Sequence, residues 1–476
     1  MHLTVTAVYA SPEAGFYGFR LTILQHFNRR ADVHDFSEQD RQTLTELAQW
    51  MADRRSLHES VRPMRAAQLP EVTEDGIGIC ATWETLRDSL LPTSFPTDHP
   101  RYLAFVGGSP TPASIIADAA MSAASVYGGS ELEAGDVVVA ERAAIRWLCN
   151  IVGYPDHAHG VFVSGGSLAN LSALVAARHE RVAGDGRPPG VIIASASAHA
   201  SIQAAAAIMG CRVVLVGSLD HRLPGSELAP VLDTFDACDI VAVVATAGAT
   251  NTGVIDALDE IADQCETRGI WLHVDAAYGG GALLAPSHRP KFDGIKRADS
   301  ITIDPHKWLF APFDCAAVLY LDPGIARSAH RQRAAYLDAA NEDDADNPAD
   351  YAVHLSRRAR GLPVWASLVA NGTDAYVDAV EGCLAVANYA AKQIETIHCL
   401  ELVTEPHLSV VLFRRHGWGS EQYAKWSEQA LVRNLALVTP TTFDGEPALR
   451  FCFVNPLTTT EDVDLVLASL ERDDVA

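Results

Sequence analysis

Short runs of apolar, largely β-branched residues recur between residues 161 and 321, separated mostly by segments of helix length. Such runs are typical of strands that are buried on both faces of a parallel sheet. Seven strands are predicted, at residues 161–163, 191–194, 213–216, 240–245, 271–274, 300–303 and 316–321. The alternation predicts an α/β domain around a mainly parallel seven-stranded sheet. Ligands bind such sheets at the carboxyl ends of the strands, so we expect the functional site there.

The stretch before this region has a different pattern. Residues 37–91 place apolar side chains at helical spacing, with interruptions at Pro63 and Pro70. We therefore predict an N-terminal helical arm at residues 1–95. The chain beyond residue 100 contains the glycine pairs 107–108 and 128–129, and we expect it to be rich in loops.

The stretch after residue 365 predicts a small α+β domain. Its expected helices lie near residues 376–397, 421–433 and 461–469, and its expected strands at 400–403, 409–413 and 449–454. We divide the remaining chain into a large domain, 96–370, and a small C-terminal domain, 371–476. Residues 327–350 break the alternation, and their acidic, turn-rich part at 341–350 predicts an exposed, mobile loop.

Composition narrows the class of protein. The 476 residues carry a formal net charge of -24, which argues against a nucleic acid partner, because such binding needs clustered Lys and Arg. The nine cysteines are scattered without metal-ligand spacing, so we expect reduced thiols and no metal. The chain shows neither a secretory signal pattern nor a spanning apolar run, and we expect a cytoplasmic enzyme without membrane contact.

Lysine is scarce, and one lysine has an unusual position. Of the five lysines, only Lys307 lies between a predicted strand at 300–303 and the apolar segment 308–310. Apolar surroundings destabilise an ammonium group, which leaves the amine free to attack a carbonyl and form a Schiff base. We therefore predict that Lys307 carries pyridoxal 5'-phosphate (PLP). The alternative is a strand-end lysine whose amine reaches water.

A second feature suits the phosphate of such a cofactor. Gly165, Gly166 and Ser167 follow the strand at 161–163 and lead into a helical pattern. Glycines let the main chain approach an anion closely, and the start of a helix offers free N–H groups. The segment lacks the Gly-Lys-Ser/Thr of nucleoside triphosphatases, and it predicts a different phosphate cradle. An ordinary Gly/Ser helix cap is the alternative.

Three further polar residues follow predicted strands. Asp275 ends a buried strand, where its carboxylate suits a protonated ring nitrogen. His199 follows the strand at 191–194 and suits a stacking position on the ring, and the Thr246 hydroxyl suits the cofactor or the substrate carboxylate. Each has a structural alternative: a carboxylate that caps a turn, an exposed imidazole, or a threonine that bonds its own main chain.

The order of these motifs resembles a known family. The sequence from about residue 99 to 365 is similar to the group II PLP-dependent amino acid decarboxylases, which include the aromatic L-amino acid, histidine and glutamate enzymes. The specific motifs are Asp-Ala-Ala-Tyr at 275–278 and Asp-Pro-His-Lys-Trp at 304–308. The resemblance implies a fold-type I homodimer with active sites at the subunit interface, and an arm that serves dimerisation.

The resemblance also implies roles for single residues. It makes Lys307 the Schiff-base lysine, Asp275 the ring-nitrogen partner, Ala277 the small residue against the ring, His199 the stacking imidazole, and Gly166, Ser167 and His306 surroundings of the phosphate and the lysine. Tyr336 resembles a loop tyrosine that protonates the intermediate. Phenylalanine at that position is associated with aldehyde-forming relatives. The alternative for Tyr336 is an apolar anchor at the base of a loop.

The sequence departs from the aromatic branch of the family at the expected substrate wall. Phe105 and Val106 stand where that branch has Tyr-Phe-Pro, and we expect both to contact the substrate. We favour decarboxylation of tryptophan, phenylalanine or tyrosine to the amine and carbon dioxide. The open alternatives are a branched aliphatic or diamino acid substrate, an aminotransferase, an aldehyde-forming oxidative decarboxylase, and a non-catalytic dimer that retains PLP.

Overall fold

The computed structural model describes residues 36–54, 69–182, 190–217, 220–337 and 346–472. The chain forms two compact units, Met1–Ser94 and Phe95–Ala476. The domain boundary near residue 370 stays a prediction. Within the described residues, no helix combines the length and apolar character needed to cross a membrane.

The first unit is helical where it is described. Helix α2 spans Glu38–Asp53 and begins with a capping box in which Ser37 and Asp40 bond each other's main-chain N–H groups. Helix α3 spans Ile79–Thr85 and continues through the π-helical turn Leu86–Leu90 and the 3-10 turn Leu91–Thr93. The rings of Trp50 and Trp83 meet edge to face at 5.8 Å and join the two helices. Pro63 lies outside the described residues.

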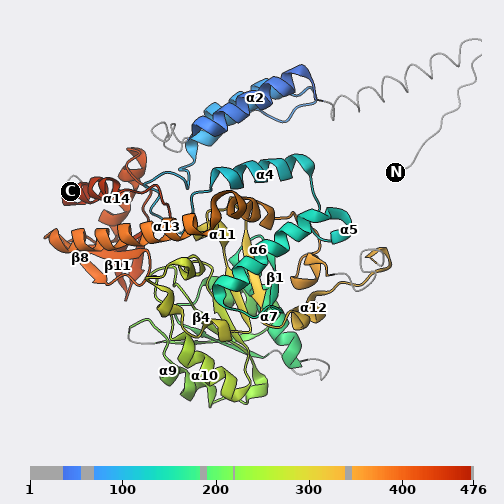
Figure 1. Ribbon diagram of the computed structural model, residues 1–476. Helices are drawn as coiled ribbons and strands as arrows, with labels where there is room; N and C mark the ends of the chain where they lie inside the picture. The colour runs from blue at the N-terminus through green and yellow to red at the C-terminus, as the bar shows by residue number, and fades with distance from the viewer. Residues whose placement is uncertain (1–35, 55–68, 183–189, 218–219, 338–345, 473–476) are drawn as a thin grey trace, which may run out of the picture. The chain divides into compact units, whose positions relative to one another are not determined.

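The second unit is built on a seven-stranded sheet in the order β1-β7-β6-β5-β4-β2-β3. Figure 1 labels β1 and β4 of this sheet. The strands are β1 (His159–Val163), β2 (Val191–Ser195), β3 (Arg212–Val216), β4 (Ile240–Thr246), β5 (Leu272–Asp275), β6 (Ser300–Ile303) and β7 (Ala316–Tyr320). All seven predicted strands are confirmed. The sheet is mixed rather than purely parallel, because β7 runs antiparallel to both β1 and β6.

Helices cover both faces of this sheet, and successive strand residues pack into opposite cores. On one face α7 (Gly166–Val182), α8 (Ala200–Met209) and α12 (Pro323–His330) pack over the side chains of Ile192 and Val244. On the other face α6 (Asp136–Val152), α9 (Gly225–Leu232), α10 (Leu258–Arg268) and α13 (Gly361–Thr396) pack over Ile193 and Val243. Full burial on both faces explains the continuous apolar runs in the sequence.

A smaller antiparallel sheet forms the C-terminal part, in the order β10-β11-β9-β8. Its strands are β8 (Leu400–Thr404), β9 (Val410–Arg415), β10 (Pro440–Phe443) and β11 (Glu446–Cys452), and its helices are α14 (Ser420–Val432) and α15 (Thr460–Glu471). Helix α13 connects this part to the large sheet and changes direction at Gly372, whose φ of 74° is the left-handed conformation that glycine adopts readily.

The structure corrects three expectations. Helices α4 (Pro112–Ala124) and α5 (Glu131–Ala134) occupy part of the region expected to be rich in loops. The short strand β10 was missed, since its four residues include a proline and two threonines that resemble a loop. Asn347 and Asp350, expected in an exposed loop, are buried, because Asn347 accepts from the Glu131 N–H and Asp350 faces Arg327 at 3.5 Å. Residues 338–345 of that loop lie outside the described part.

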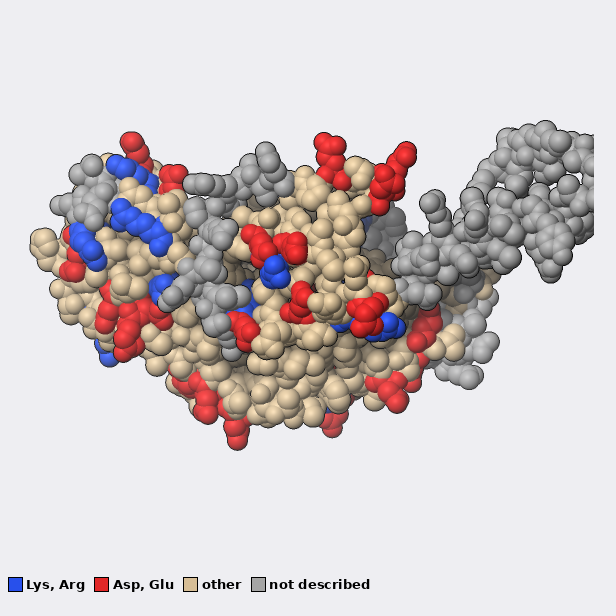
Figure 2. All heavy atoms as spheres, turned by 90° about the horizontal axis from the view of Figure 1, so that it is seen from above, with Lys and Arg blue, Asp and Glu red and all other residues tan. Residues whose placement is uncertain are grey.

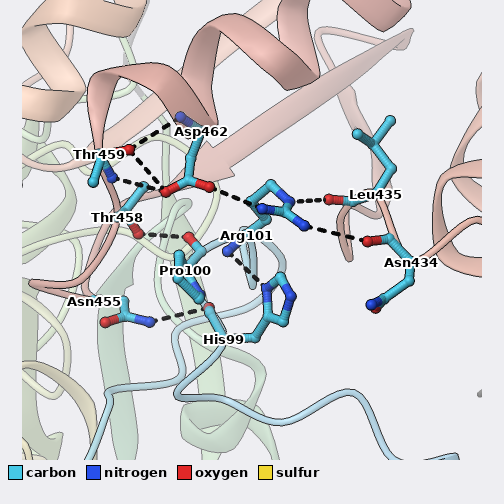
Figure 3. A network of polar contacts seen from close by, with 9 residues as sticks. All are labelled: His99, Pro100, Arg101, Asn434, Leu435, Asn455, Thr458, Thr459 and Asp462. Atoms are coloured by element: carbon cyan, nitrogen blue, oxygen red, sulfur yellow. Dashed lines mark hydrogen bonds and ion pairs between the residues drawn. The ribbon is translucent and has the colours of Figure 1, made fainter. Parts of the chain in front are cut away.

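A polar network fixes the first residues of the second unit to its C-terminal part. Figure 3 shows the Arg101 guanidinium between the Asp462 carboxylate, 3.0 Å away, and the carbonyl oxygens of Leu435 and Asn434. Nearby, Asn455 donates to the His99 carbonyl at 3.0 Å and Thr458 to the Pro100 carbonyl. The segment that continues to residues 105–108 therefore starts from a fixed point.

Charge is spread over the surface. Asp and Glu side chains are scattered over the face seen in Figure 2, while Lys and Arg gather mainly at the end that Figure 1 shows to hold α14. On this face the acidic side chains are therefore not confined to one segment.

Candidate active site

A cavity of about 240 Å³ lies at the carboxyl ends of the parallel strands. It gathers nine of the predicted site residues: Gly165, Gly166, Ser167, His199, Thr246, Asp275, Ala277, His306 and Lys307. The local fold explains how these residues reach the cavity: β4 ends at Thr246, β5 ends at Asp275, and the short helix α11 (Pro305–Trp308) starts two residues after β6. Because these elements meet at one edge of the sheet, residues that lie more than 140 positions apart in the chain come together there.

Lys307 is held by a carboxylate. Its Nζ lies 3.0 Å from Oδ2 of Asp304, and its side chain keeps 22% of its surface exposed. Burial alone lowers the pKa of the Lys307 amine, but the charges of Asp304 and Asp275 outweigh burial and raise that pKa above its ordinary value. The expectation that apolar surroundings free the amine from its proton is therefore wrong for the protein without its cofactor.

Asp275 is fixed by two donors. Its Oδ2 accepts from the Asn170 amide at 2.9 Å, and its Oδ1 accepts from the Ala277 N–H at 3.1 Å. The side chain is 5% exposed, so a polar partner inside the cavity would meet a carboxylate already oriented by the protein.

Asn170 was missed by sequence reasoning and joins two parts of the site. Its amide N–H groups reach Asp275 and Ser201, both at 2.9 Å, and its Oδ1 lies 3.0 Å from Nε2 of His273. Since an amide oxygen only accepts, Nε2 of His273 carries the hydrogen. The only signal was helical spacing, because Asn170 lies one turn after Gly166 in α7.

His273, a fully buried residue of β5, extends this network into the protein interior. Burial lowers its pKa to about 4, although Asp275 acts in the opposite direction, so the imidazole is neutral near pH 7. With Nε2 as donor, Nδ1 accepts from the Ser300 hydroxyl at 2.8 Å, and that hydroxyl in turn accepts from the Trp271 indole at 2.9 Å. Every polar group of this buried chain thus has a partner.

His199 precedes α8 and caps it. Its Nδ1 accepts from the Ser201 N–H at 3.2 Å and lies 2.9 Å from the Ser201 hydroxyl. The oxygen of that hydroxyl accepts a hydrogen bond from the Asn170 amide. The imidazole and the Asp275 carboxylate are therefore connected through Ser201 and Asn170. This connection fixes the ring at the cavity wall without burying it.

The residues at the start of α7 suit an anion. A Cβ at Gly165 would meet nothing within 4 Å, while one at Gly166 would lie 2.9 Å from Asp304 and 3.2 Å from Ala277. The first N–H groups of α7 have no acceptor within the helix. His306, buried nearby, accepts from the Cys315 N–H at 3.2 Å, and burial lowers the pKa of its imidazole despite Asp304.

Three predicted residues are not among those that line this cavity. Val106 is buried, and Phe105 is 57% exposed with a left-handed φ of 52°, its carbonyl bound by Arg450 at 2.8 Å. The segment still touches the site, because a Cβ at Gly108 would overlap the Lys307 carbonyl oxygen. Tyr336 belongs to a 3-10 turn at Ala335–Leu337, and its side chain lies outside the described residues.

The cavity fits PLP. It offers an amine, an oriented carboxylate and an open helix start within one space. In the described part of the chain, Thr246 Oγ1 and Asp304 Oδ1 are buried without a hydrogen-bond partner, so polar groups remain for a ligand to satisfy. No cluster of potential metal ligands occurs among those residues. The fold and the site together thus have the groups that a phosphorylated aldehyde cofactor requires.

Comparison with known proteins identifies the family. Residues 72–416 match the pyridoxal-dependent decarboxylase conserved domain, so the chain belongs to this family and is a PLP-dependent amino acid decarboxylase. The resemblance to the group II decarboxylases, the fold type and the cofactor are thereby confirmed. The finer choice of substrate is not decided by family membership.

Two relatives that are named for different substrates have the same sequence identity to this chain. The chain is 32% identical to an aromatic-L-amino-acid decarboxylase of Bacillus atrophaeus over 79% of this chain and 81% of that protein. It is also 32% identical to an L-2,4-diaminobutyrate decarboxylase of Rhizobium meliloti, over 84% and 83%. The crystal structure of mouse CSAD superposes with a TM-score of 0.83 at 26% identity, covering 90% of this chain and 98% of that one.

The network predicts the effect of removing its central amide. In Asn170→Leu, Asp275 and His273 lose partners while buried, so the free energy of unfolding of the cofactor-free protein should fall by about 1–3 kcal/mol. Urea denaturation measures this change. The control is Asn150→Leu at an exposed position of α6, which we expect to change stability by less than about 0.5 kcal/mol. Equal stability of both variants would contradict the role of Asn170.

Proposed function

We propose that this enzyme decarboxylates an aromatic L-amino acid, tryptophan, phenylalanine or tyrosine, to the corresponding amine and carbon dioxide. The observation that carries the reaction is the presence of Lys307, Asp275 and His199 around one cavity. The choice of an aromatic substrate is supported by the composition of the cavity wall and by the similarity to the aromatic-L-amino-acid decarboxylase.

The proposed cofactor contacts follow from the chemistry of each group. Lys307 supplies the amine that joins the cofactor aldehyde, and the Asp275 carboxylate holds a proton at the ring nitrogen. Gly165, Gly166 and Ser167 bind the phosphate with His306 nearby, while Ala277 and His199 contact the ring and Thr246 supplies a hydroxyl. When bound, PLP supplies a ring that accepts the electron pair left behind by carbon dioxide.

The protein's own part in the reaction is to orient the substrate and to move protons. A substrate carboxylate that points away from solvent loses carbon dioxide more readily when the cavity excludes water. We assign the proton that replaces the carboxylate at Cα to the Tyr336 hydroxyl, with His199 assisting. Tyr336 comes from the partner subunit of a homodimer in this proposal.

The wall of the cavity favours an uncharged substrate side chain. No arginine is found among its described lining residues, and Lys307 is the only permanently basic one. An acidic side chain such as a sulfinate or carboxylate would lack a cation of its own there. Phe105 and Val106 precede Gly108, which lies against the Lys307 carbonyl oxygen, and in this proposal they supply apolar surface for an aromatic ring.

One other substrate class has specific support. The similarity to the L-2,4-diaminobutyrate decarboxylase supports a diamino acid, whose second ammonium could pair with the Asp304 carboxylate. An aldehyde-forming reaction would follow if Tyr336 did not deliver the proton. An aminotransferase is disfavoured, because Arg450, its candidate carboxylate clamp, binds the Phe105 carbonyl.

A substrate panel tests the proposed specificity. We expect the highest kcat/KM with tryptophan, phenylalanine or tyrosine among all proteinogenic L-amino acids and 2,4-diaminobutyrate, measured by carbon dioxide release and amine detection. A higher value for 2,4-diaminobutyrate or for a branched aliphatic amino acid would remove the aromatic assignment while leaving the reaction class intact.

The lysine assignment predicts a spectroscopic change. Lys307→Ala should abolish the visible absorbance of lysine-linked PLP and all measurable carbon dioxide release, because Lys307 is the only lysine among the described residues that line the cavity. Lys296→Ala, at an exposed position, is the control and should keep both. If the visible band persists in Lys307→Ala, the cofactor is attached elsewhere.

The tyrosine assignment predicts a change of product. In Tyr336→Phe the Cα proton donor is lost, so amine formation should fall by about 10²- to 10⁴-fold, with aldehyde and ammonia formed when oxygen is present. Tyr389→Phe, a tyrosine on α13 that bonds Asp464, serves as the control. Unchanged amine output from Tyr336→Phe would exclude this tyrosine as the donor.

A further inference from the structure

Asp304 is a buried carboxylate at the place proposed for the cofactor phosphate. Only 2% of its surface is exposed, and its Oδ1 has no hydrogen-bond partner among the described residues. A Cβ built at Gly166 would lie 2.9 Å from its Oδ2 and 3.1 Å from its Oδ1. The carboxylate therefore lies against the first residue of α7, where the positive end of the helix attracts an anion.

The charges around Asp304 do not favour a second anion. Lys307, at 3.0 Å, is the cation that faces it, and the negative charge of Asp275 also acts on that amine. Two carboxylates against one ammonium leave a net charge of -1 before any phosphate arrives. A phosphate monoester brings about -1.5 to -2 more at pH 7.

The other titratable groups nearby do not supply a compensating charge. His306 Nε2 lies 3.6 Å from Asp304 Oδ2, but burial lowers the pKa of this imidazole, so it is neutral near pH 7. The thiols of Cys315 and Cys452 are protonated, because burial raises the pKa of both. Beyond His306, the Asp314 carboxylate is paired with Arg360 at 2.9 Å.

Helix α7 itself contributes no titratable side chain at this point, because its first residues are Gly166, Ser167 and Leu168. The exposed imidazole of His199 lines the same cavity from the start of α8. The groups packed against Asp304 thus do not neutralise both anions, and the carboxylate and the phosphate would carry like charges at one helix terminus. A hydrogen held between two oxygens would turn this repulsion into a strong hydrogen bond.

We propose that Asp304 and the PLP phosphate share one proton, so that this enzyme binds its cofactor with uptake of a proton from solvent. The proposal rests on the proposed phosphate site at Gly165–Ser167. The balance is simple: one solvent proton becomes held between a carboxyl oxygen and a phosphate oxygen, no covalent bond to carbon or phosphorus changes, and the proton returns to solvent on release. Asp304 is thereby a positioning residue that makes phosphate binding depend on pH.

The sign of the pH dependence follows from the stoichiometry. Because the complex holds one proton more than the separated partners, binding must weaken as pH rises. Between pH 7 and 9 the free phosphate monoester, with a second pKa of about 6, is already a dianion. For methyl phosphate, which carries no ring nitrogen, the association constant should therefore fall about tenfold for each pH unit in this range.

The test measures protons rather than activity. Pyridoxine 5'-phosphate has the ring and phosphate but no aldehyde, so it binds without reacting with Lys307. Calorimetric titration of the full-length cofactor-free protein in buffers of different ionisation enthalpy counts the protons taken up. Wild type should take up about one proton more than Asp304→Asn, whose carboxamide donates a hydrogen without titrating. Equal proton uptake by the two proteins would overturn the proposal.

Two controls assign the proton. In His306→Asn the side-chain oxygen can still accept from the Cys315 N–H, and we expect the wild-type proton uptake to remain. Loss of the uptake in His306→Asn, together with its retention in Asp304→Asn, would place the proton on the imidazole and refute the role of Asp304. Competition by methyl phosphate against pyridoxine 5'-phosphate on the wild-type protein tests the phosphate group alone. A methyl phosphate affinity that is independent of pH from 7 to 9 would also refute the role of Asp304.

The same ligand separates this proposal from the assignment of the cradle. Gly166→Val would put a side chain against Asp304 and Ala277, and it should weaken pyridoxine 5'-phosphate binding at least about tenfold. Binding that Gly166→Val leaves unchanged would overturn both the cradle and the role of Asp304. Binding that is weakened by Gly166→Val, but occurs without the extra proton, would overturn only the role of Asp304.

Discussion

The hydrogen bonds of one amide, that of Asn170, hold the active-site residues in their relative positions. Its two N–H groups reach Asp275 and Ser201, and its oxygen accepts from His273. Through Ser201 the same amide determines where His199 lies. A carboxylate at the end of β5 and an imidazole at the start of α8 are thus fixed by a residue of α7, in an interior where unsatisfied polar groups would be costly.

The second constraint is the excess of negative charge around one amine. Asp304 and Asp275 keep Lys307 protonated in the cofactor-free protein, contrary to the simple expectation for a buried lysine. The site is therefore organised for a ligand that changes these charges, because Thr246 Oγ1 and Asp304 Oδ1 have no hydrogen-bond partner among the described residues. Relatives named for an aromatic and for a diamino substrate are each 32% identical to this chain, so overall identity does not select the substrate.

The sequence was sufficient for the large sheet because full burial requires continuous apolar strands. All seven were found, and the residues that follow them formed the candidate site through the rule that parallel strands end at one edge. The sequence did not predict the antiparallel direction of β7 or the short strand β10, because strand direction and weak edge pairing depend on long-range partners. Helix α4 was missed because the glycine pairs around it suggested loops.

By itself, the sequence determined which groups are available: a lysine after a strand, a carboxylate, a histidine and a glycine-rich helix start, in an order that resembles one family. The tertiary structure decided how these groups influence one another. It turned Asn170 from an ordinary helix residue into the centre of the network, and Asp304 from part of a motif into the partner of Lys307. The physical reason is that pKa values and hydrogen bonds depend on distances of about 3 Å between residues far apart in the chain, which no local pattern encodes.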